Sequence, residues 1–143
     1  MADILHRITI EATPPEIYEA LTTIDGIKSW WTDACEMADR EGGQCKFWFD
    51  QKATCFTMTA KRLLPHQRVF WLCTDGPREW IDTELWWEIT PVSRNQCRVD
   101  FKHMNWVSDE GGFPLCNSTW GGLMFKLKES CENAAIHEPL FSN

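Results

Sequence analysis

His103 is the residue whose sequence context best suits it to chemistry. It lies in the segment 96–104, QCRVDFKHM, where Cys97, Val99, Phe101 and His103 alternate with polar residues. This period of two indicates a half-buried strand, so we expect the imidazole on the apolar face, where it must be hydrogen-bonded. The residue is then either a core histidine with satisfied hydrogen bonds, or a group that bonds a ligand or acts as a general base.

No other residue completes a catalytic set with His103. No nucleophile lies at a recognisable spacing from a base, and the sequence pattern predicts no pair of carboxylates on an inward face. The four histidines are far apart and no His, Cys and Asp cluster has metal-ligand spacing, so no metal is predicted. No glycine-rich phosphate loop follows a strand, and no cofactor is predicted. A cyclase- or hydrolase-type enzyme that uses His103 is therefore the third of three functional hypotheses.

Composition narrows the classes of partner. The formal net charge is −7, and the 14 lysines and arginines form no basic stripe, so no nucleic-acid partner is expected. No apolar run approaches 18 residues and no signal-peptide pattern is present, so no membrane span is expected. The seven cysteines include no C-x-x-C pair and are interpreted as reduced, mostly buried residues, with the cytoplasm as the expected compartment.

The N-terminal third predicts one strand and two short helices. Residues 4–11 alternate between apolar and polar, and Thr13 with Glu16 forms a capping-box signature before an apolar helical stripe. A second helical turn over 26–31 would align Trp31 with that stripe and turn Trp30 aside. We therefore predict Trp31 in the core and Trp30 at a cavity rim or on a contact surface.

The rest of the chain predicts an antiparallel sheet and one long helix. Short turn signals separate further strand-like segments at 44–49, 54–64, 68–74, 82–90 and 96–104. An amphipathic helix of some five turns follows, and residues 137–143 are expected to be a loose tail. The predicted fold is α+β: one domain over 1–143, in which a curved six-stranded antiparallel sheet wraps around the C-terminal helix, with two short helices after the first strand.

Several of these motifs also occur, in the same order, in a known family. They are ITIEATPPEIYEALT, GIKSWWT, GGQCKFWF, LLPHQRVFW, VDFKHMNW and W-x-x-L-M-x-x-L-K. Over about residues 4–135 the chain resembles the START-like (SRPBCC) superfamily with its helix-grip (Bet v 1-like) fold. More narrowly, it is similar to the branch related to the C-terminal domain of the Hsp90 ATPase activator Aha1.

This resemblance implies a cavity between the sheet and the C-terminal helix, suited to an apolar, aromatic or lipid-like small molecule. The leading hypothesis is therefore a non-catalytic binding protein, and the alternative is that the same side chains fill a solid core. Polar groups would come from His103 and Thr83, with Asn117 or Thr119 as further candidates. The predicted lining consists of Trp30, Phe47, Phe49, Trp71, Thr83, Leu85, Trp87, Phe101, His103, Trp120 and Met124.

The second hypothesis is a protein-interaction module. Strand alternation turns Trp86 and Trp48 outward, and Trp80 is expected to be exposed with them. Exposed, clustered tryptophans often mark an interface. The partner would be a second copy of the chain or, as the resemblance implies, the chaperone Hsp90. Coverage of these tryptophans by the N-terminal helices or by a loop is the alternative.

Overall fold

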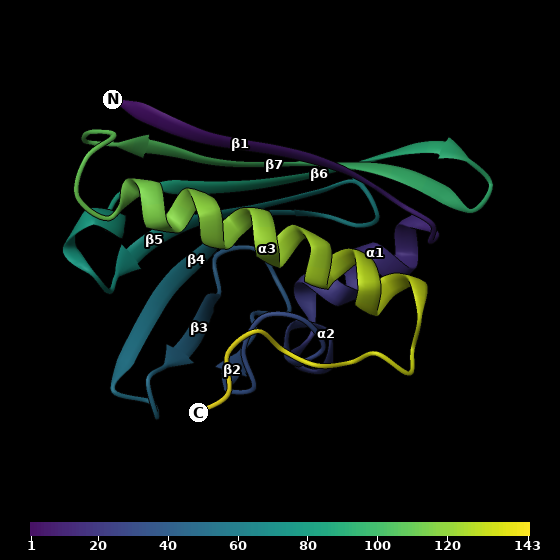
Figure 1. The fold of residues 1–143 in the computed structure, drawn as a ribbon, viewed down its shortest axis with the longest axis horizontal. Helices are drawn as coiled ribbons and strands as arrows, with labels where there is room; N and C mark the ends of the chain where they lie inside the picture. The colour runs from purple at the N-terminus through teal and green to yellow at the C-terminus, as the bar shows by residue number, and fades with distance from the viewer.

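The predicted antiparallel sheet is present and has seven strands in the order β1-β7-β6-β5-β4-β3-β2 (Figure 1). The computed structural model describes all of residues 1–143. The strands are β1 Ala2–Ile10, β2 Cys35–Glu36, β3 Gln44–Phe49, β4 Thr54–Leu64, β5 Arg68–Asp75, β6 Glu84–Ser93 and β7 Gln96–Trp106. The predicted count of six is corrected by β2, in which Cys35 pairs with Phe47 of β3. Two residues are too few to show an alternation in sequence.

Two short helices follow β1 as predicted. In α1, Pro14–Thr22, the Thr13 hydroxyl accepts from the Glu16 N–H at 3.4 Å, and the Glu16 carboxylate accepts from the Thr13 N–H at 3.3 Å. This capping box satisfies two N–H groups that the first turn would leave free. In α2, Ile24–Lys28, the backbone passes so close to α1 that a Cβ added at Gly26 would lie 2.2 Å from the Glu19 carbonyl oxygen.

Both tryptophans of the adjacent pair are buried, so the prediction that Trp30 turns toward a rim or a contact surface is wrong. Helix α2 ends at Lys28, and the two residues therefore lie beyond the helix on which the prediction placed them. Trp30 is 0% exposed and Trp31 2% exposed, and their rings stack at 5.6 Å. The Trp30 indole N–H donates to the Ala20 carbonyl at 2.9 Å, which satisfies its polar atom in the core.

The long helix α3, Phe113–Glu132, lies across one face of the sheet (Figure 1). It buries the apolar stripe that the sequence predicts, which consists of Trp120, Leu123, Met124 and Leu127. Gly121 and Gly122 do not serve a close approach between helix and sheet. An added Cβ at Gly121 would make only an ordinary contact of 3.5 Å with His6, and one at Gly122 would meet nothing within 4 Å.

The C-terminal residues are docked, which corrects the expectation of a loose tail over 137–143. Phe141 forms a parallel bridge with Thr32, and its N–H donates to the Trp31 carbonyl at 3.0 Å. The Asn143 N–H donates to the Asp33 carboxylate at 2.9 Å. The chain end therefore lies beside β2 (Figure 1). Backbone hydrogen bonds hold residues 140 and 141 and leave no pattern in the side chains, whereas the side chains of Asp33 and Asn143 hold the last residue.

None of the helices combines the length and the apolar character that crossing a bilayer requires.

The two helical glycines Gly26 and Gly122 should respond oppositely to alanine. Gly26→Ala places a methyl group against the α1 backbone and should lower the free energy of unfolding by about 2–3 kcal/mol. Gly122→Ala enters open space and should raise it by about 0.5–1 kcal/mol through helix propensity. Urea denaturation followed by tryptophan fluorescence measures both. A neutral Gly26→Ala would show that α1 and α2 are not closely packed.

Candidate functional site

Strand alternation predicts the buried faces of the sheet correctly, but most of these side chains form a solid core. All eleven predicted lining residues are buried, with exposed fractions of 9% or less. Neighbouring rings fill the space between them: Phe101 lies 4.3 Å from Trp87 and 4.2 Å from Trp120 between ring centroids. Nine of the eleven do not line the apolar pocket beside α3: Trp30, Phe47, Trp71, Thr83, Leu85, Trp87, Phe101, His103 and Met124.

His103 lies in this core with both ring nitrogens hydrogen-bonded. The Trp120 indole N–H donates to His103 Nδ1 at 3.1 Å, so Nδ1 is an acceptor. Nε2 must then carry the proton, and it donates to Thr83 Oγ1 at 2.8 Å. Thr83 in turn donates to the Trp80 carbonyl at 2.5 Å. These donors fix the tautomer and link α3, β7 and the turn before β6.

The surroundings of His103 keep the imidazole neutral. Burial lowers the pKa of His103 to about 3, because the charged form would lose its hydration. The side chain is 0% exposed and does not line the pocket. Its contacts instead hold Trp120 and the turn that carries Trp80, both of which line the pocket. The geometry therefore gives His103 a positioning role, with no free nitrogen for acid–base catalysis.

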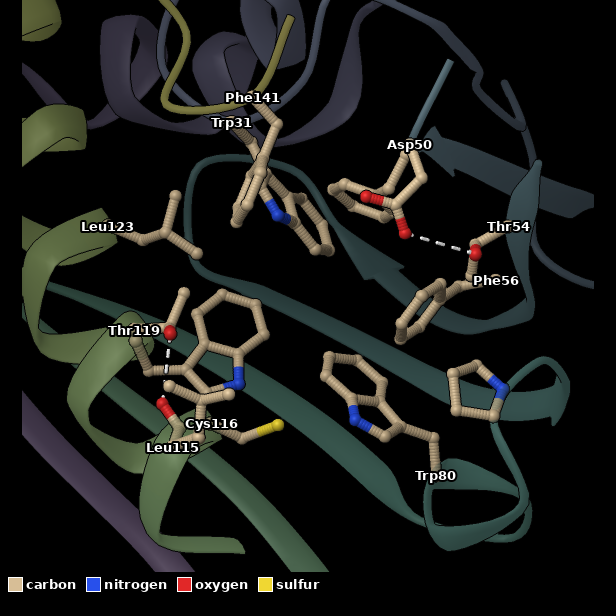
Figure 2. Close-up of a pocket in the computed structure, with 13 residues that line it drawn as sticks. Trp31, Asp50, Thr54, Phe56, Trp80, Leu115, Cys116, Thr119, Leu123 and Phe141 are labelled. Carbon is tan, nitrogen blue, oxygen red and sulfur yellow. Dashed lines mark hydrogen bonds between the residues drawn. The ribbon is translucent and has the colours of Figure 1, made fainter. Parts of the chain in front are cut away.

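The most apolar pocket lies between the first half of α3 and the end of the sheet that carries β3 and β4. Its volume is about 390 Å³. Figure 2 shows α3 side chains on one side and side chains from the strands and turns on the other, facing a common space. Six aromatic residues dominate the lining: Trp31, Phe49, Phe56, Trp80, Trp120 and Phe141. The apolar part of the wall is completed by Leu115, Cys116, Leu123 and Pro77.

Five of these aromatic rings form a closed loop, each in contact with the next. The centroid distances are 5.9 Å from Trp31 to Phe49 and 5.1 Å from Phe49 to Phe56. They are 4.4 Å from Phe56 to Trp80, 6.1 Å from Trp80 to Trp120, and 5.2 Å from Trp120 back to Trp31. Phe141 packs edge-on against Phe49 at 5.1 Å. We call these five residues the aromatic ring of the pocket.

Few polar groups face the pocket. Thr119 donates to the Leu115 carbonyl at 2.9 Å, and Thr54 donates to the Asp50 carboxylate at 3.4 Å, so both hydroxyl protons are used (Figure 2). Burial raises the pKa of the Cys116 thiol, the neighbouring Trp80 indole lowers it, and the nearby Glu79 charge raises it. With the pKa raised overall, this thiol is protonated and weakly nucleophilic near neutral pH.

The other predicted polar and outward residues lie in different places. Asn117 lies on another side of α3, where its side-chain oxygen is 3.0 Å from His6 Nε2. Trp80 is 7% exposed, so its predicted outward position is wrong: the 3₁₀ turn η1, Arg78–Trp80, returns it to the core. Trp86 and Trp48 do face outward and are half-buried, with Trp86 stacked on Phe70 at 4.0 Å.

Four of the six aromatic wall residues were not predicted to line the pocket, because they lie outside the predicted inward faces. Trp31 was assigned to the core, Trp80 was assigned outward, and Phe141 belongs to the segment expected to be loose. Only Phe56 carried a usable signal. It lies two residues from the buried Met58 in β4, so alternation places it on the inner face, opposite Phe47.

The structure contains no candidate metal site. No cluster of three or more His, Cys, Asp or Glu side chains could hold a metal ion. All seven cysteines are free thiols.

A curved antiparallel sheet that grips a C-terminal helix, with a pocket between them, defines a START-like (SRPBCC) protein of the helix-grip fold. Within this class, the chain belongs to the family of activator of Hsp90 ATPase homolog 1-like proteins, whose model matches residues 11–132.

Solved structures agree with this assignment. The chain is similar to Aha1 from Colwellia psychrerythraea, solved in solution as a dimer, with 35% identity and a TM-score of 0.84 over 92% of this chain and 97% of that one. The AHSA1-like protein from Aeromonas hydrophila shares the fold at 16% identity, with a TM-score of 0.75 over 94% and 95% of the two chains. SSP2350 from Staphylococcus saprophyticus does so at 12% identity, with a TM-score of 0.76 over 93% of each. Among curated proteins, none matches the chain.

The buried neutral His103 should make stability depend on pH. Because its pKa falls from 6.5 to about 3 on folding, the unfolded chain binds the extra proton between these values. The free energy of unfolding should therefore be fully present above pH 6.5 and decrease as the pH falls toward 3, by about 2–3 kcal/mol at pH 4.5. His103→Gln should remove this contribution and flatten the profile, measured by urea denaturation at pH 4.5 to 7.5.

The matched control is His66→Gln at an exposed position, which should leave the wild-type profile unchanged. Identical pH profiles for wild type and His103→Gln would show that the imidazole is not held neutral by the fold.

Proposed function

We propose that the protein binds a small apolar or aromatic molecule in the pocket between α3 and the β3–β4 end of the sheet. The observation that carries this proposal is an apolar pocket of about 390 Å³ beside a core that is otherwise filled by side chains. Ligand sites in proteins are typically concave, largely apolar and about 300–1,000 Å³ in volume. In this proposal, Phe49 and Trp120 contact the ligand, and the other nine predicted residues support the pocket from behind.

The chemistry of the pocket favours binding over turnover. Cys116 is the only thiol in the lining, and burial keeps it protonated. The neighbouring Trp80 indole, which lowers the pKa of this thiol, cannot serve as a base. An activated nucleophile requires a base or a lowered pKa, and Cys116 has neither.

Filling the pocket mouth should abolish binding. Thr119 lines the pocket and is half-buried, whereas Ser118 is exposed and does not line it. Thr119→Phe should weaken binding of benzyl alcohol and 2-naphthalenemethanol at least tenfold, because the added ring occupies ligand space. Chemical-shift changes of the indole ¹H–¹⁵N signals of Trp80 and Trp120 measure the affinity. Ser118→Phe should bind as the wild type does, and unchanged binding by Thr119→Phe would place any ligand elsewhere.

A second candidate function is self-association. It is supported by the similar Aha1 from Colwellia psychrerythraea, which forms a dimer. The face of the sheet opposite α3 carries Leu5, Lys102, Trp86 and Phe70 in one cross-strand row, since each is paired with the next. Leu5 is 63% exposed. Leu5, Trp86 and Phe70 are the apolar side chains of this row, and an isologous dimer would bury them. Contact with Hsp90 stays a prediction, for which a pull-down is the test.

The self-association proposal predicts the molar mass. Light scattering after size exclusion should give twice the 16.7 kDa of one chain, and Leu5→Glu should halve the mass by placing a charge in the interface. Val107→Glu is the control, because Val107 is 89% exposed in the loop before α3. A wild-type mass of one chain, or a dimer insensitive to Leu5→Glu, would contradict dimerisation through this row.

A further inference from the structure

The aromatic ring of the pocket has the shape of a box. Neighbouring planes are steeply inclined, by 73° between Phe49 and Phe56 and by 86° between Phe56 and Trp80. The three other pairs are tilted by 33° to 52°. A flat slot between parallel rings would suit a planar ligand, whereas walls inclined in several directions suit a compact, rounded group.

The dimensions of the ring match a cation–π site. Successive centroids are 4.4 to 6.1 Å apart. In a regular planar pentagon of this spacing, the centre would lie roughly 4–5 Å from each centroid, within the ~6 Å over which a cation is attracted to an aromatic ring. Three of the five rings are indoles, which bind cations most strongly.

The pocket lining carries a single charged side chain, which is acidic. Asp50 is the only ionisable carboxylate in the lining, and no lysine, arginine or histidine lines it. Behind the wall, the Glu79 carboxylate accepts from the Gly112 N–H at 3.0 Å and lies close enough to Cys116 to affect its thiol. An anionic ligand, such as a fatty acid, would therefore find no counter-charge, and the net charge of −7 adds to its repulsion.

The Asp50 carboxylate is held at the mouth of the pocket. Asp50, Gln51 and Lys52 all have positive φ, at 54°, 55° and 66°. Non-glycine residues rarely adopt this left-handed conformation, and a run of three defines a specific, constrained turn. Thr54 donates to the carboxylate from the start of β4 (Figure 2). Asp50 is exposed, so its charge is available to a group that enters from solvent.

We infer that the ligand is an organic cation, with an amine or quaternary ammonium group inside the aromatic ring of the pocket and Asp50 as its counter-ion. This inference rests on the proposed function and adds the charge of the ligand. The aromatic walls supply apolar contact and cation–π attraction together, whereas a neutral ligand would gain the apolar contact alone.

The test compares probes of the same shape and different charge. Benzyltrimethylammonium should bind at least tenfold more tightly than neopentylbenzene, its neutral carbon isostere, and phenylacetate should not bind. Changes in the indole ¹H–¹⁵N signals give the affinities. Asp50→Asn preserves the left-handed turn, because asparagine tolerates it, and should weaken binding of the cation about three- to tenfold without affecting neopentylbenzene. Asp39→Asn removes the same charge at an exposed site outside the pocket, and it should change the affinity for neither probe.

The outcomes separate the two proposals. Equal or tighter binding of neopentylbenzene would overturn the cation inference and leave the binding function intact. Tight binding of phenylacetate would also overturn it. If neither these probes nor the aromatic alcohols bind, the binding function fails as well. An unchanged affinity of Asp50→Asn for the ammonium probe would remove Asp50 as its counter-ion.

Discussion

The hydrogen-bond chain from Trp120 through His103 and Thr83 to the Trp80 carbonyl is the interaction on which the site depends. It crosses a dry interior, where each bond is stronger than in water and an unpaired imidazole would be costly. The chain therefore fixes how α3 is rotated on the sheet and where the turn before β6 lies. Its two ends, Trp120 and Trp80, are adjacent members of the aromatic ring of the pocket. A buried histidine that touches no ligand thus sets the geometry of the surface that would touch one.

Aromatic side chains build both a filled core and a pocket. The core is stable without a ligand because the free energy gained by burying an indole exceeds the cost of leaving its N–H group unpaired. Trp71, Trp87 and Trp106 are buried with indole N–H groups that lack a partner. An unpaired buried donor costs about 1–3 kcal/mol. Burying roughly 200–250 Å² of an indole contributes about 5–6 kcal/mol at 25 cal/mol per Å², which exceeds that cost. The aromatic side chains can therefore fill the core completely, and the open space is left beyond them, in the pocket.

The sequence predicts those parts of the fold that repeat with a fixed period. Alternation assigns Trp87 inward and Trp86 outward correctly, because successive side chains of a strand must face opposite sides of the sheet. It fails at Trp30 and Trp80, which lie beyond a helix end and in a 3₁₀ turn, where no period applies. Phe141 itself is held by backbone hydrogen bonds, which every residue type except proline can donate.

The position of the pocket follows from how the sheet grips its helix. Helix α3 packs against β1 at one edge of the sheet, whereas β3 and β4 lie toward the opposite edge and away from α3 (Figure 1). The opening on that side is bridged by side chains from the end of β3, from β4, from the turn before β6 and from the C-terminal segment. Only large rings reach across such a gap without extra backbone. Three of the nine tryptophans, Trp31, Trp80 and Trp120, serve this closure, and the closed loop of aromatic rings is the boundary that results.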